Sequence, residues 1–308
     1  MSEAFDARMT EWREQIDDCI ATAVADSRYS DKFKEILNYA LFPGGKRLRP
    51  ILFLEWHSLY APPDKNALLF ASAIEIVHAY SLIHDDMPCM DNSDTRRGKP
   101  SVHKAFGEGK ALLAGDALLT LAFKCMSESM DHDHQVMTYV ASQLCGDSGI
   151  IEGQYLDLYS DCGTLSELLD CYAKKTAALI TLACAAGYVF PQLSGAGSYE
   201  FEGALGGISA DCIDGTEDMA QFVGNREARV LGATSFGNAF GTAFQIYDDL
   251  SEYISGEKPD GKNILDFVSF DDAKKLLNRY LNKAIFELEK VGGDTSTLSE
   301  LTRKFVIA

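Results

Sequence analysis

Long apolar segments dominate the chain. Four of them span residues 66–84, 110–126, 168–190 and 230–250, and each is longer than a typical β-strand. Segments in which apolar and polar residues alternate, as they do in a half-buried strand, are scarce. We therefore predict an all-α protein in which these four segments form long helices.

Small residues recur inside these segments. Ala114 and Gly115 lie in the second, and Gly237 and Gly241 lie in the fourth. Small side chains let helix axes approach closely, which suits a compact bundle. A chain of 308 residues exceeds the usual domain size, but a helical chain of this length can still form one large core. We predict a single domain over residues 1–308.

One segment does not fit the helical pattern. Residues 193–216 have five glycines between Gly195 and Gly207, weak periodicity and scattered acidic side chains. We predict an irregular insertion around 193–216.

The composition describes an acidic globular protein. The chain has 46 acidic and 28 basic side chains, which give a formal charge of −18. This charge repels phosphate backbones and anionic membrane surfaces, so we expect no nucleic-acid partner. Glu75 and His78 interrupt the segment 66–84 and favour a core helix over a membrane span. We therefore expect no stable membrane insertion.

The N-terminal sequence and the cysteines point to the cytoplasm. The first 19 residues carry an acidic side chain every few positions and have no apolar core of a signal peptide. The eight cysteines form no CxxC pair, and several lie within apolar segments, so we interpret most of them as reduced core residues rather than metal ligands.

An acidic cluster follows the apolar segment 66–84 directly. It contains Asp85, Asp86 and Asp91, and Pro88 lies between them. Proline disfavours helix at the preceding residue, so the helix should end there and the chain can return Asp91 toward Asp85. Converging carboxylates suit Mg²⁺, which binds a few protein oxygens and leaves its other positions to water and substrate phosphates. The alternative is a solvated acidic loop.

A second acidic cluster ends the apolar segment 230–250. Asp248 and Glu252 are four residues apart and share a helix face, and Asp249 lies about a quarter turn away. Alone, this cluster could be ordinary charge at a helix end. Together with the first cluster it indicates a second metal-binding edge.

Basic residues complete the pattern. The sequence GGKRLRP at residues 44–50 places three cations in a glycine-led turn, which suits a diphosphate or a basic surface turn. Lys174, Lys175 and Thr176 lie within another apolar segment, and Lys262 follows the second acidic cluster. The combination of cations and metal-binding carboxylates suits the departure of pyrophosphate by ionisation of a carbon–oxygen bond. No P-loop or dinucleotide-binding fingerprint competes with this interpretation.

Residues 84–104, HDDMPCMDNSDTRRGKPSVHK, resemble the first aspartate-rich motif of the trans-isoprenyl diphosphate synthases. The form DDxxxxD is similar to that of short-chain bacterial farnesyl and plant-type geranylgeranyl diphosphate synthases. Further similarity follows in the expected order, in GGKRLRP (44–50), EIVHAYSLIH (75–84), LLAGDALL (112–119) and FQIYDD (244–249). The resemblance implies a bundle of about ten antiparallel helices around a deep central cavity, and a homodimer.

The resemblance also implies residue roles. Isopentenyl diphosphate would be held by Lys46, Arg49, His78 and Arg97. The allylic diphosphate would face Arg96, Lys175, Thr176, Gln245 and Lys262. Magnesium would be bound by Asp85, Asp91 and Asp248, with Asp249 and Glu252 as further candidates. The catalytic set would then be Asp85, Asp86, Asp91, Arg96, Lys175 and Asp248. A lone histidine on an apolar helix is more often a hydrogen-bonded core residue, and this remains the alternative for His78.

Chain length is set in this family by bulk on the helix that precedes the first motif. Tyr80 lies five residues before Asp85, and Ser81 follows it. An aromatic side chain there predicts a fifteen-carbon product, farnesyl diphosphate, with geranylgeranyl diphosphate as the alternative. The enzyme would join isopentenyl diphosphate head to tail with dimethylallyl or geranyl diphosphate, with Mg²⁺ as cofactor.

The sequence departs from the family pattern at two places. The second acidic motif ends in Glu252, so it reads DDxxE instead of DDxxD, and no proline follows Lys262. These departures keep open a non-catalytic subunit that modulates another prenyl synthase. A terpene cyclase would not need GGKRLRP, and a metal phosphohydrolase would need more histidine ligands than the six present provide.

Overall fold

The structure is a computed structural model that describes residues 2–129, 135–192, 225–256 and 261–307. The insertion predicted around 193–216 lies outside the described residues. Helices make up most of the described chain, and the described strands are only two residues long each, which confirms the all-α prediction. The helices are α1 (Glu3–Ala25), α2 (Asp31–Leu41), α3 (Leu48–Ser58), α4 (Lys65–Asp85), α5 (Val102–Phe106), α6 (Glu108–Glu128), α7 (Gln135–Cys145), α8 (Ile150–Tyr159), α9 (Leu165–Tyr172), α10 (Ala178–Val189), α12 (Asn225–Ser255), α13 (Phe270–Val291) and α14 (Ser296–Arg303).

Five short elements accompany these helices. The described strands form one antiparallel hairpin, in which β1 (Thr95–Arg96) pairs with β2 (Lys99–Pro100). A single π-helical turn, η2 (Ala173–Ala177), joins α9 to α10. Two 3₁₀ turns are η3 (Phe190–Gln192) and η7 (Ile264–Asp266).

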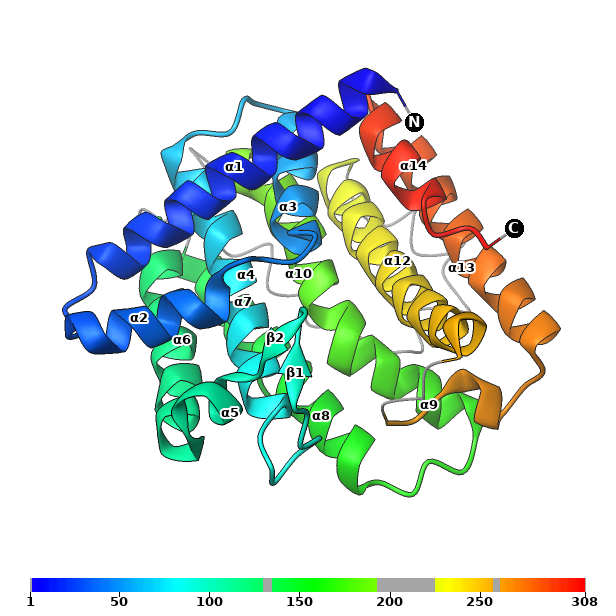
Figure 1. Cartoon of the computed structure of the whole chain (residues 1–308). Helices are drawn as coiled ribbons and strands as arrows, with labels where there is room; N and C mark the ends of the chain where they lie inside the picture. Colours follow the sequence, from blue (N-terminus) through cyan, green and yellow to red (C-terminus); the bar gives the residue numbers. More distant parts are fainter. Residues whose placement is uncertain (1, 130–134, 193–224, 257–260, 308) are drawn as a thin grey trace.

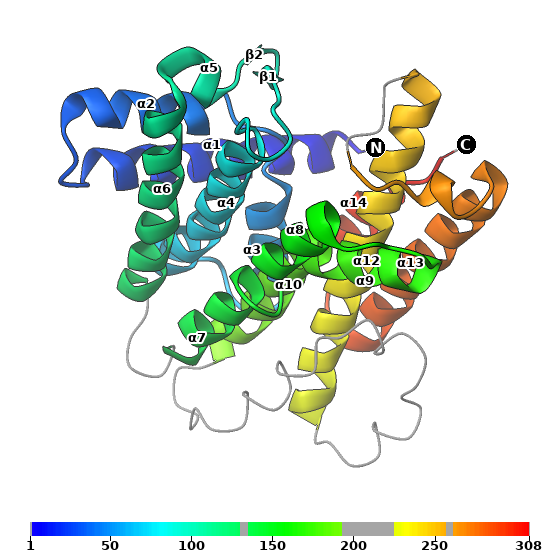
Figure 2. The ribbon, with the colours of Figure 1, turned by 90° about the horizontal axis from the view of Figure 1, so that it is seen from below.

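Helix α10 lies in the core of the bundle. Every residue of α10 is buried, and the helix packs against α3 on one side and α12 on another. Helix α12 also packs along α13, and α4 packs along α6 and α3, as Figures 1 and 2 show. The ends of α4, α8, η2 and α12 are thereby brought to one region of the molecule.

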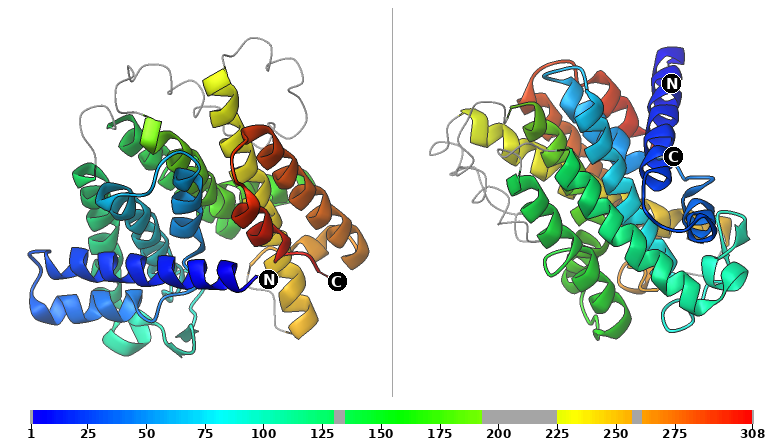
Figure 3. Two further views of the ribbon diagram at one scale, coloured as in Figure 1. Left: turned by 90° about the horizontal axis from the view of Figure 1, so that it is seen from above. Right: turned by 90° about the vertical axis from the view of Figure 1, so that its left-hand side faces the viewer.

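The two ends of the described chain meet. The backbone N–H of Ser2 donates a hydrogen bond to Oε1 of Glu300 at 2.9 Å, which ties the start of α1 to α14. Figure 3 shows both termini on the same side of the bundle. Trp12 and Arg8 of α1 also donate hydrogen bonds to Glu55 of α3, at 2.7 and 2.5 Å.

Local sequence signals define α4. The side chain of Asp64 accepts hydrogen bonds from the backbone N–H groups of Asn66 and Ala67, which caps the helix N-terminus. Among the described residues, α4 is the one helix long and apolar enough to cross a membrane, and 67% of its most apolar window is buried in the bundle. The burial identifies α4 as a core helix, as the sequence predicted.

The predicted helix at 168–190 is interrupted by the π-helical turn η2. Two glycines of neighbouring helices permit close contact with this turn. A Cβ atom at Gly153 of α8 would lie 2.2 Å from the backbone N of Lys175, and one at Gly241 of α12 would lie 2.5 Å from the Cα of Ala177. Single π-helical turns often occur at functional sites.

The seven described cysteines form no disulfide, and Cys212 lies outside the described residues. Cys125, Cys145, Cys171 and Cys184 are buried, whereas Cys89 is exposed.

Candidate active site

The first acidic cluster forms a tight turn at the end of α4. Asp85 is the last residue of the helix, and its carbonyl oxygen accepts a 2.9 Å hydrogen bond from the backbone N–H of Asp91. This contact confirms the predicted return of the chain. Burial raises the pKa of Asp85 to about 7; the charge of Lys175 opposes this rise and that of Asp91 adds to it. Burial therefore disfavours the charged form of Asp85 more than the neighbouring cations favour it.

Asp86 has a different environment. Its side chain is buried and forms an ion pair with Arg96 of β1, with Nη2 and Oδ1 2.5 Å apart. The structure thus uses Asp86 to anchor the arginine predicted to face the allylic diphosphate. Its catalytic role stays a prediction, and the contact that the structure shows is that of a positioning group.

The arginine that follows lies against the basic turn before α3. Arg97 has a positive φ of 53°, and a Cβ atom at Gly45 would lie only 2.9 Å from its Nη2 atom. Burial lowers the pKa of Arg97, although the charge of Glu75 opposes this effect. Glycine at residue 45 therefore allows the hairpin β1–β2 and the basic turn to come together.

The three cations of the basic turn do not all face outward, which corrects the interpretation of GGKRLRP. Arg47 is 2% exposed and its guanidinium donates to Asp17 at 2.8 Å, to Glu75 at 2.9 Å and to the carbonyl of Leu41 at 2.8 Å. Arg47 therefore joins α1, α3 and α4. Lys46 is exposed instead.

The other two cations surround the second acidic cluster. The Nζ atom of Lys46 lies 5.9 Å from the ring centre of Phe244 and 5.8 Å from that of Phe305. Arg49 is half-buried, and burial lowers its pKa, an effect that the charges of Glu75 and Asp248 oppose. Both cations are available to an anion at the ends of α4 and α12.

His78 lies on α4 among these arginines. Burial lowers its pKa well below the usual value, and the charges of Arg49, Arg97 and further arginines lower it more. The imidazole is therefore neutral at pH 7. A core histidine would not normally face several guanidinium groups, so this environment favours a position beside a bound anion. The predicted binding role stays a prediction.

The second acidic cluster divides into two environments. Asp248 is half-buried, and burial raises its pKa to about 6; the charge of Lys46 opposes this rise and that of Asp249 adds to it. Glu252 lies one helical turn later and is also half-buried. Asp249 is only 3% exposed and accepts hydrogen bonds from Tyr172, Gln245 and the backbone of Ile264.

Sequence reasoning missed an important partner of the lysine on η2. Asp157 of α8 forms a 2.5 Å ion pair with Lys175, and the side chains are 7% and 29% exposed. Burial disfavours the charge on Lys175, but the charges of Asp157, Asp85 and Asp91 outweigh burial and raise its pKa. One signal was present: Gly153, four residues earlier, marks the face of α8 that contacts η2.

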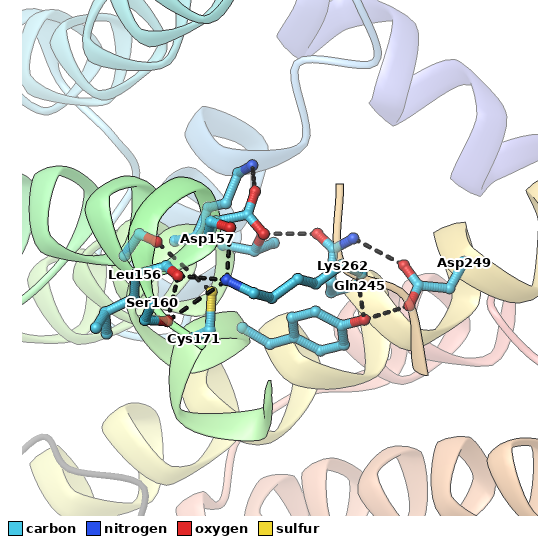
Figure 4. Close-up of polar contacts among 11 residues, drawn as sticks. Leu156, Asp157, Ser160, Cys171, Gln245, Asp249 and Lys262 are labelled. Atoms are coloured by element: carbon cyan, nitrogen blue, oxygen red, sulfur yellow. Dashed lines mark hydrogen bonds and ion pairs between the residues drawn. The ribbon is translucent and has the colours of Figure 1, made fainter. Parts of the chain in front are cut away.

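Lys262 contacts the same end of α8. Its Nζ atom donates to the carbonyls of Leu156 and Asp157 at 2.5 Å and lies 3.4 Å from the hydroxyl of Ser160 (Figure 4). In this arrangement, the lysine caps the C-terminus of α8. Its predicted contact with the allylic diphosphate stays a prediction.

A pocket extends from Asp85 between α4, α6 and α8. Its volume is about 340 Å³, and its lining includes Tyr80, Ser81, Leu119 and Tyr155. Tyr80 is 4% exposed, and its hydroxyl has no hydrogen-bond partner among the described residues. Burial raises the pKa of this hydroxyl. The pocket therefore has carbon-rich walls with its charged groups at one end.

The chain matches the family model of polyprenyl synthetase over residues 30–205. It is 39% identical over 285 residues to the farnesyl diphosphate synthase of Micrococcus luteus, and the alignment covers 87% of each chain. The chain belongs to the polyprenyl synthetase family. The predicted resemblance, fold class and prenyltransferase class are confirmed.

Further comparisons agree with this polyprenyl synthetase assignment. The chain is 35% identical over 259 residues to the farnesyl diphosphate synthase of Geobacillus stearothermophilus, an alignment that covers 79% of this chain and 76% of that protein. It is similar to the crystal structure of an FPP/GFPP synthase from Zymomonas mobilis, with a TM-score of 0.79, 29% identity and full coverage of both chains. A geranyltranstransferase from Thermotoga maritima gives a TM-score of 0.74 at 26% identity, with 96% of each chain covered.

The acidic residues of this polyprenyl synthetase supply oxygen atoms, the kind of ligand that Mg²⁺ prefers. Within the described ranges, no three acidic, cysteine or histidine side chains are grouped so that they could hold a metal ion by themselves. Asp85 and Asp248 are carboxylates whose pKa is raised by burial, so a divalent cation beside them would favour their charged forms. Oxygen donors divided between two helix ends match the preference of Mg²⁺ for a few protein ligands.

Proposed function

We propose that this polyprenyl synthetase joins isopentenyl diphosphate head to tail with dimethylallyl or geranyl diphosphate and releases farnesyl diphosphate as its main product. One observation carries the proposal: a pocket with carbon-rich walls begins at Asp85 and is lined by Tyr80, while the positive charges of Lys175 and Arg96 act on Asp85. This arrangement separates a diphosphate-binding region from a prenyl-binding region.

The basic residues divide into two groups by position. Lys46, Arg49 and Arg97 lie together with His78, and we assign them to isopentenyl diphosphate. A neutral imidazole can still donate one hydrogen bond to a diphosphate oxygen. This group also lies beside Asp248, so the two diphosphates would bind at neighbouring positions.

Arg96, Lys175, Thr176, Gln245 and Lys262 form the second group, which we assign to the allylic diphosphate. Lys175 and Arg96 are each held by a carboxylate, Asp157 and Asp86. Fixed cations stabilise charge that develops on a leaving group without reorganising during the reaction. The reaction breaks the carbon–oxygen bond of the allylic substrate and forms a carbon–carbon bond to isopentenyl diphosphate. A proton is then lost, and the released pyrophosphate can accept it.

Mg²⁺ would be held by Asp85, Asp91 and Asp248, with Glu252 at the same end of α12. When bound, the metal would neutralise negative charge on the diphosphates. Carbon-rich walls would keep water from the allylic cation, which water would otherwise quench, once the exposed lining residues Ile151, Tyr155 and Tyr159 are covered. These residues therefore perform binding, orientation and exclusion of water, and the structure requires no strong protein base.

We also propose that the protein is a cytoplasmic homodimer. Large apolar side chains are exposed on the neighbouring helices α6 and α8, and a second copy of the chain could cover them. They are Leu112, Leu113, Ile151, Tyr155 and Tyr159. Light scattering of the purified protein tests this idea, because a particle of 33.8 kDa in solution would contradict it.

The activity test uses pure protein with Mg²⁺, isopentenyl diphosphate and either allylic starter, followed by separation of the dephosphorylated products by length. We expect a fifteen-carbon alcohol. A twenty-carbon alcohol would keep the reaction and contradict the role of Tyr80. No condensation with either starter would refute the proposed activity and favour a modulatory subunit.

Two variants test Tyr80 as the limit of chain length. Tyr80→Ala removes the ring from the pocket, so we expect longer products. Tyr80→Phe keeps the bulk and removes a hydroxyl that has no partner in the described chain, so we expect the product length to stay the same. If both variants give the wild-type product, Tyr80 does not limit the chain.

A further inference from the structure

A buried hydrogen-bond network joins α9, α12 and the start of η7. Its centre is the pair Tyr172 and Asp249, each 3% exposed. The Tyr172 hydroxyl donates to Oδ2 of Asp249, and the backbone N–H of Ile264 donates to the same atom at 2.8 Å. Oδ1 of Asp249 accepts from Nε2 of Gln245 at 3.0 Å.

The network continues to the proposed allylic-diphosphate residues. Oε1 of Gln245 accepts a hydrogen bond from Thr176 at 2.7 Å, so the amide of Gln245 is fixed at both ends. Figure 4 shows Gln245 beside Asp249, with the hydrogen bond between them drawn as a dashed line. The Tyr172 hydroxyl also lies 3.4 Å from the carbonyl oxygen of Lys262.

The position of Tyr172 in the chain adds a second argument. It is the last residue of α9, and the π-helical turn that carries Lys175 and Thr176 begins at the next residue. A side chain that fixes this point also fixes the start of the turn. The pair Tyr172 and Asp249 therefore contacts every element that carries a residue of the allylic group except the hairpin β1–β2.

We propose that Tyr172 and Asp249 are positioning residues that orient Thr176, Gln245 and Lys262 toward the allylic diphosphate. The proposal rests on the proposed function, because it names the substrate of that site. It also reassigns Asp249, which the sequence predicted as a metal ligand. Three protein donors already occupy its two oxygens, and a carboxylate has about four lone-pair positions.

The test compares Tyr172→Phe with Tyr247→Phe. The first variant removes only the hydroxyl that binds Asp249. Tyr247 of α12 is half-buried, and its hydroxyl makes no hydrogen bond within the described ranges. The second variant removes this hydroxyl. Asp249→Asn is a third variant, since its amide keeps one acceptor oxygen. KM for geranyl diphosphate, KM for isopentenyl diphosphate and the half-saturating Mg²⁺ concentration are measured for each.

We expect Tyr172→Phe to raise KM for geranyl diphosphate about five- to tenfold, the effect expected for loss of one ordinary hydrogen bond. KM for isopentenyl diphosphate and the Mg²⁺ requirement should stay at wild-type values, as should all three quantities in Tyr247→Phe. A merely structural hydroxyl would change both KM values together. Equal kinetics for Tyr172→Phe and Tyr247→Phe would overturn the proposal. So would an Asp249→Asn variant that changes only the Mg²⁺ requirement.

Direct binding separates this proposal from the proposed function. The probe is the thiolo analogue of dimethylallyl diphosphate, whose carbon–sulfur bond does not ionise readily, titrated calorimetrically with Mg²⁺ present. If the wild type binds the probe without any turnover of substrates, the proposed function fails. Weaker binding by Tyr172→Phe would then still support the positioning role, whereas equal binding, or no binding to the wild type, would refute it.

Discussion

Arg47 and Lys46 are adjacent in sequence but should have separable roles. Arg47→Met removes a guanidinium that is 1% exposed and leaves Glu75, 3% exposed, without its partner. Removal of one member of a buried ion pair costs about 3–5 kcal/mol. The unfolding entropy is about 2.1 cal/mol/K per residue, or about 0.65 kcal/mol/K for 308 residues. The expected fall in Tm is therefore about 5 to 8 °C.

Lys46→Met is the matched control for this prediction. Lys46 is exposed and forms no ion pair in the described chain, so its removal should leave Tm almost unchanged. The same variant should raise KM for isopentenyl diphosphate, because its cation is available to an anion. Thermal unfolding and steady-state kinetics of both variants provide the measurements. A Tm for Arg47→Met within about 1 °C of the wild type would refute the buried position of Arg47.

Three further predictions concern the surroundings of the site. Gly115→Ala would place a Cβ atom 2.1 Å from Nε2 of His84, so denaturation should show a loss of about 1–3 kcal/mol. Gly109→Ala on the same helix meets nothing within 4 Å and should cause no such loss. Asp157→Asn releases the lysine on η2, and kinetics should show about a tenfold higher KM for the allylic substrate, equivalent to about 1.4 kcal/mol. Asp85→Asn should be more stable than metal-free wild type at pH 8. The folded pKa of Asp85 is raised to about 7, so protonation stabilises the wild type as pH falls from about 7 toward 4. The difference in unfolding free energy between variant and wild type should therefore shrink as pH falls. A difference that stays constant would contradict the raised pKa.

The sequence was sufficient to predict the end of α4 because the causes are local. Pro88 disfavours helix just before it, and the short span to Asp91 leaves the chain only a tight return. The orientation of Arg47 could not be predicted in the same way. Its partners, Asp17 and Glu75, come from α1 and α4, so they become neighbours only when the bundle has formed.

Asp157 and Tyr172 were missed for a related reason. Both are isolated polar residues within helical segments, and neither belongs to a cluster of charges in the sequence. Their roles arise from contacts between residues far apart in the sequence. Asp157 and Lys175 are 18 residues apart, and Tyr172 and Asp249 are 77 residues apart. Clusters of charge therefore led to the candidate ligand-binding residues, whereas the residues that contact and hold these candidates could be found only in the packed structure.

The altered second motif, DDxxE, is consistent with this division of roles. Asp249 faces inward to Tyr172, while Asp248 and Glu252 are both half-buried and lie one turn apart on α12. Glu252 is four residues from Asp248 and three from Asp249, so the residue that replaces the third aspartate lies on the same side of the helix as both and slightly nearer in direction to Asp248. Glutamate has one more methylene than aspartate and keeps the carboxylate, so its oxygens reach farther from the same helical position. We therefore expect Glu252→Asp to retain activity with a changed Mg²⁺ requirement. A titration of Mg²⁺ against the initial rate would measure this requirement. An inactive Glu252→Asp variant would contradict this expectation and show that the longer side chain is essential.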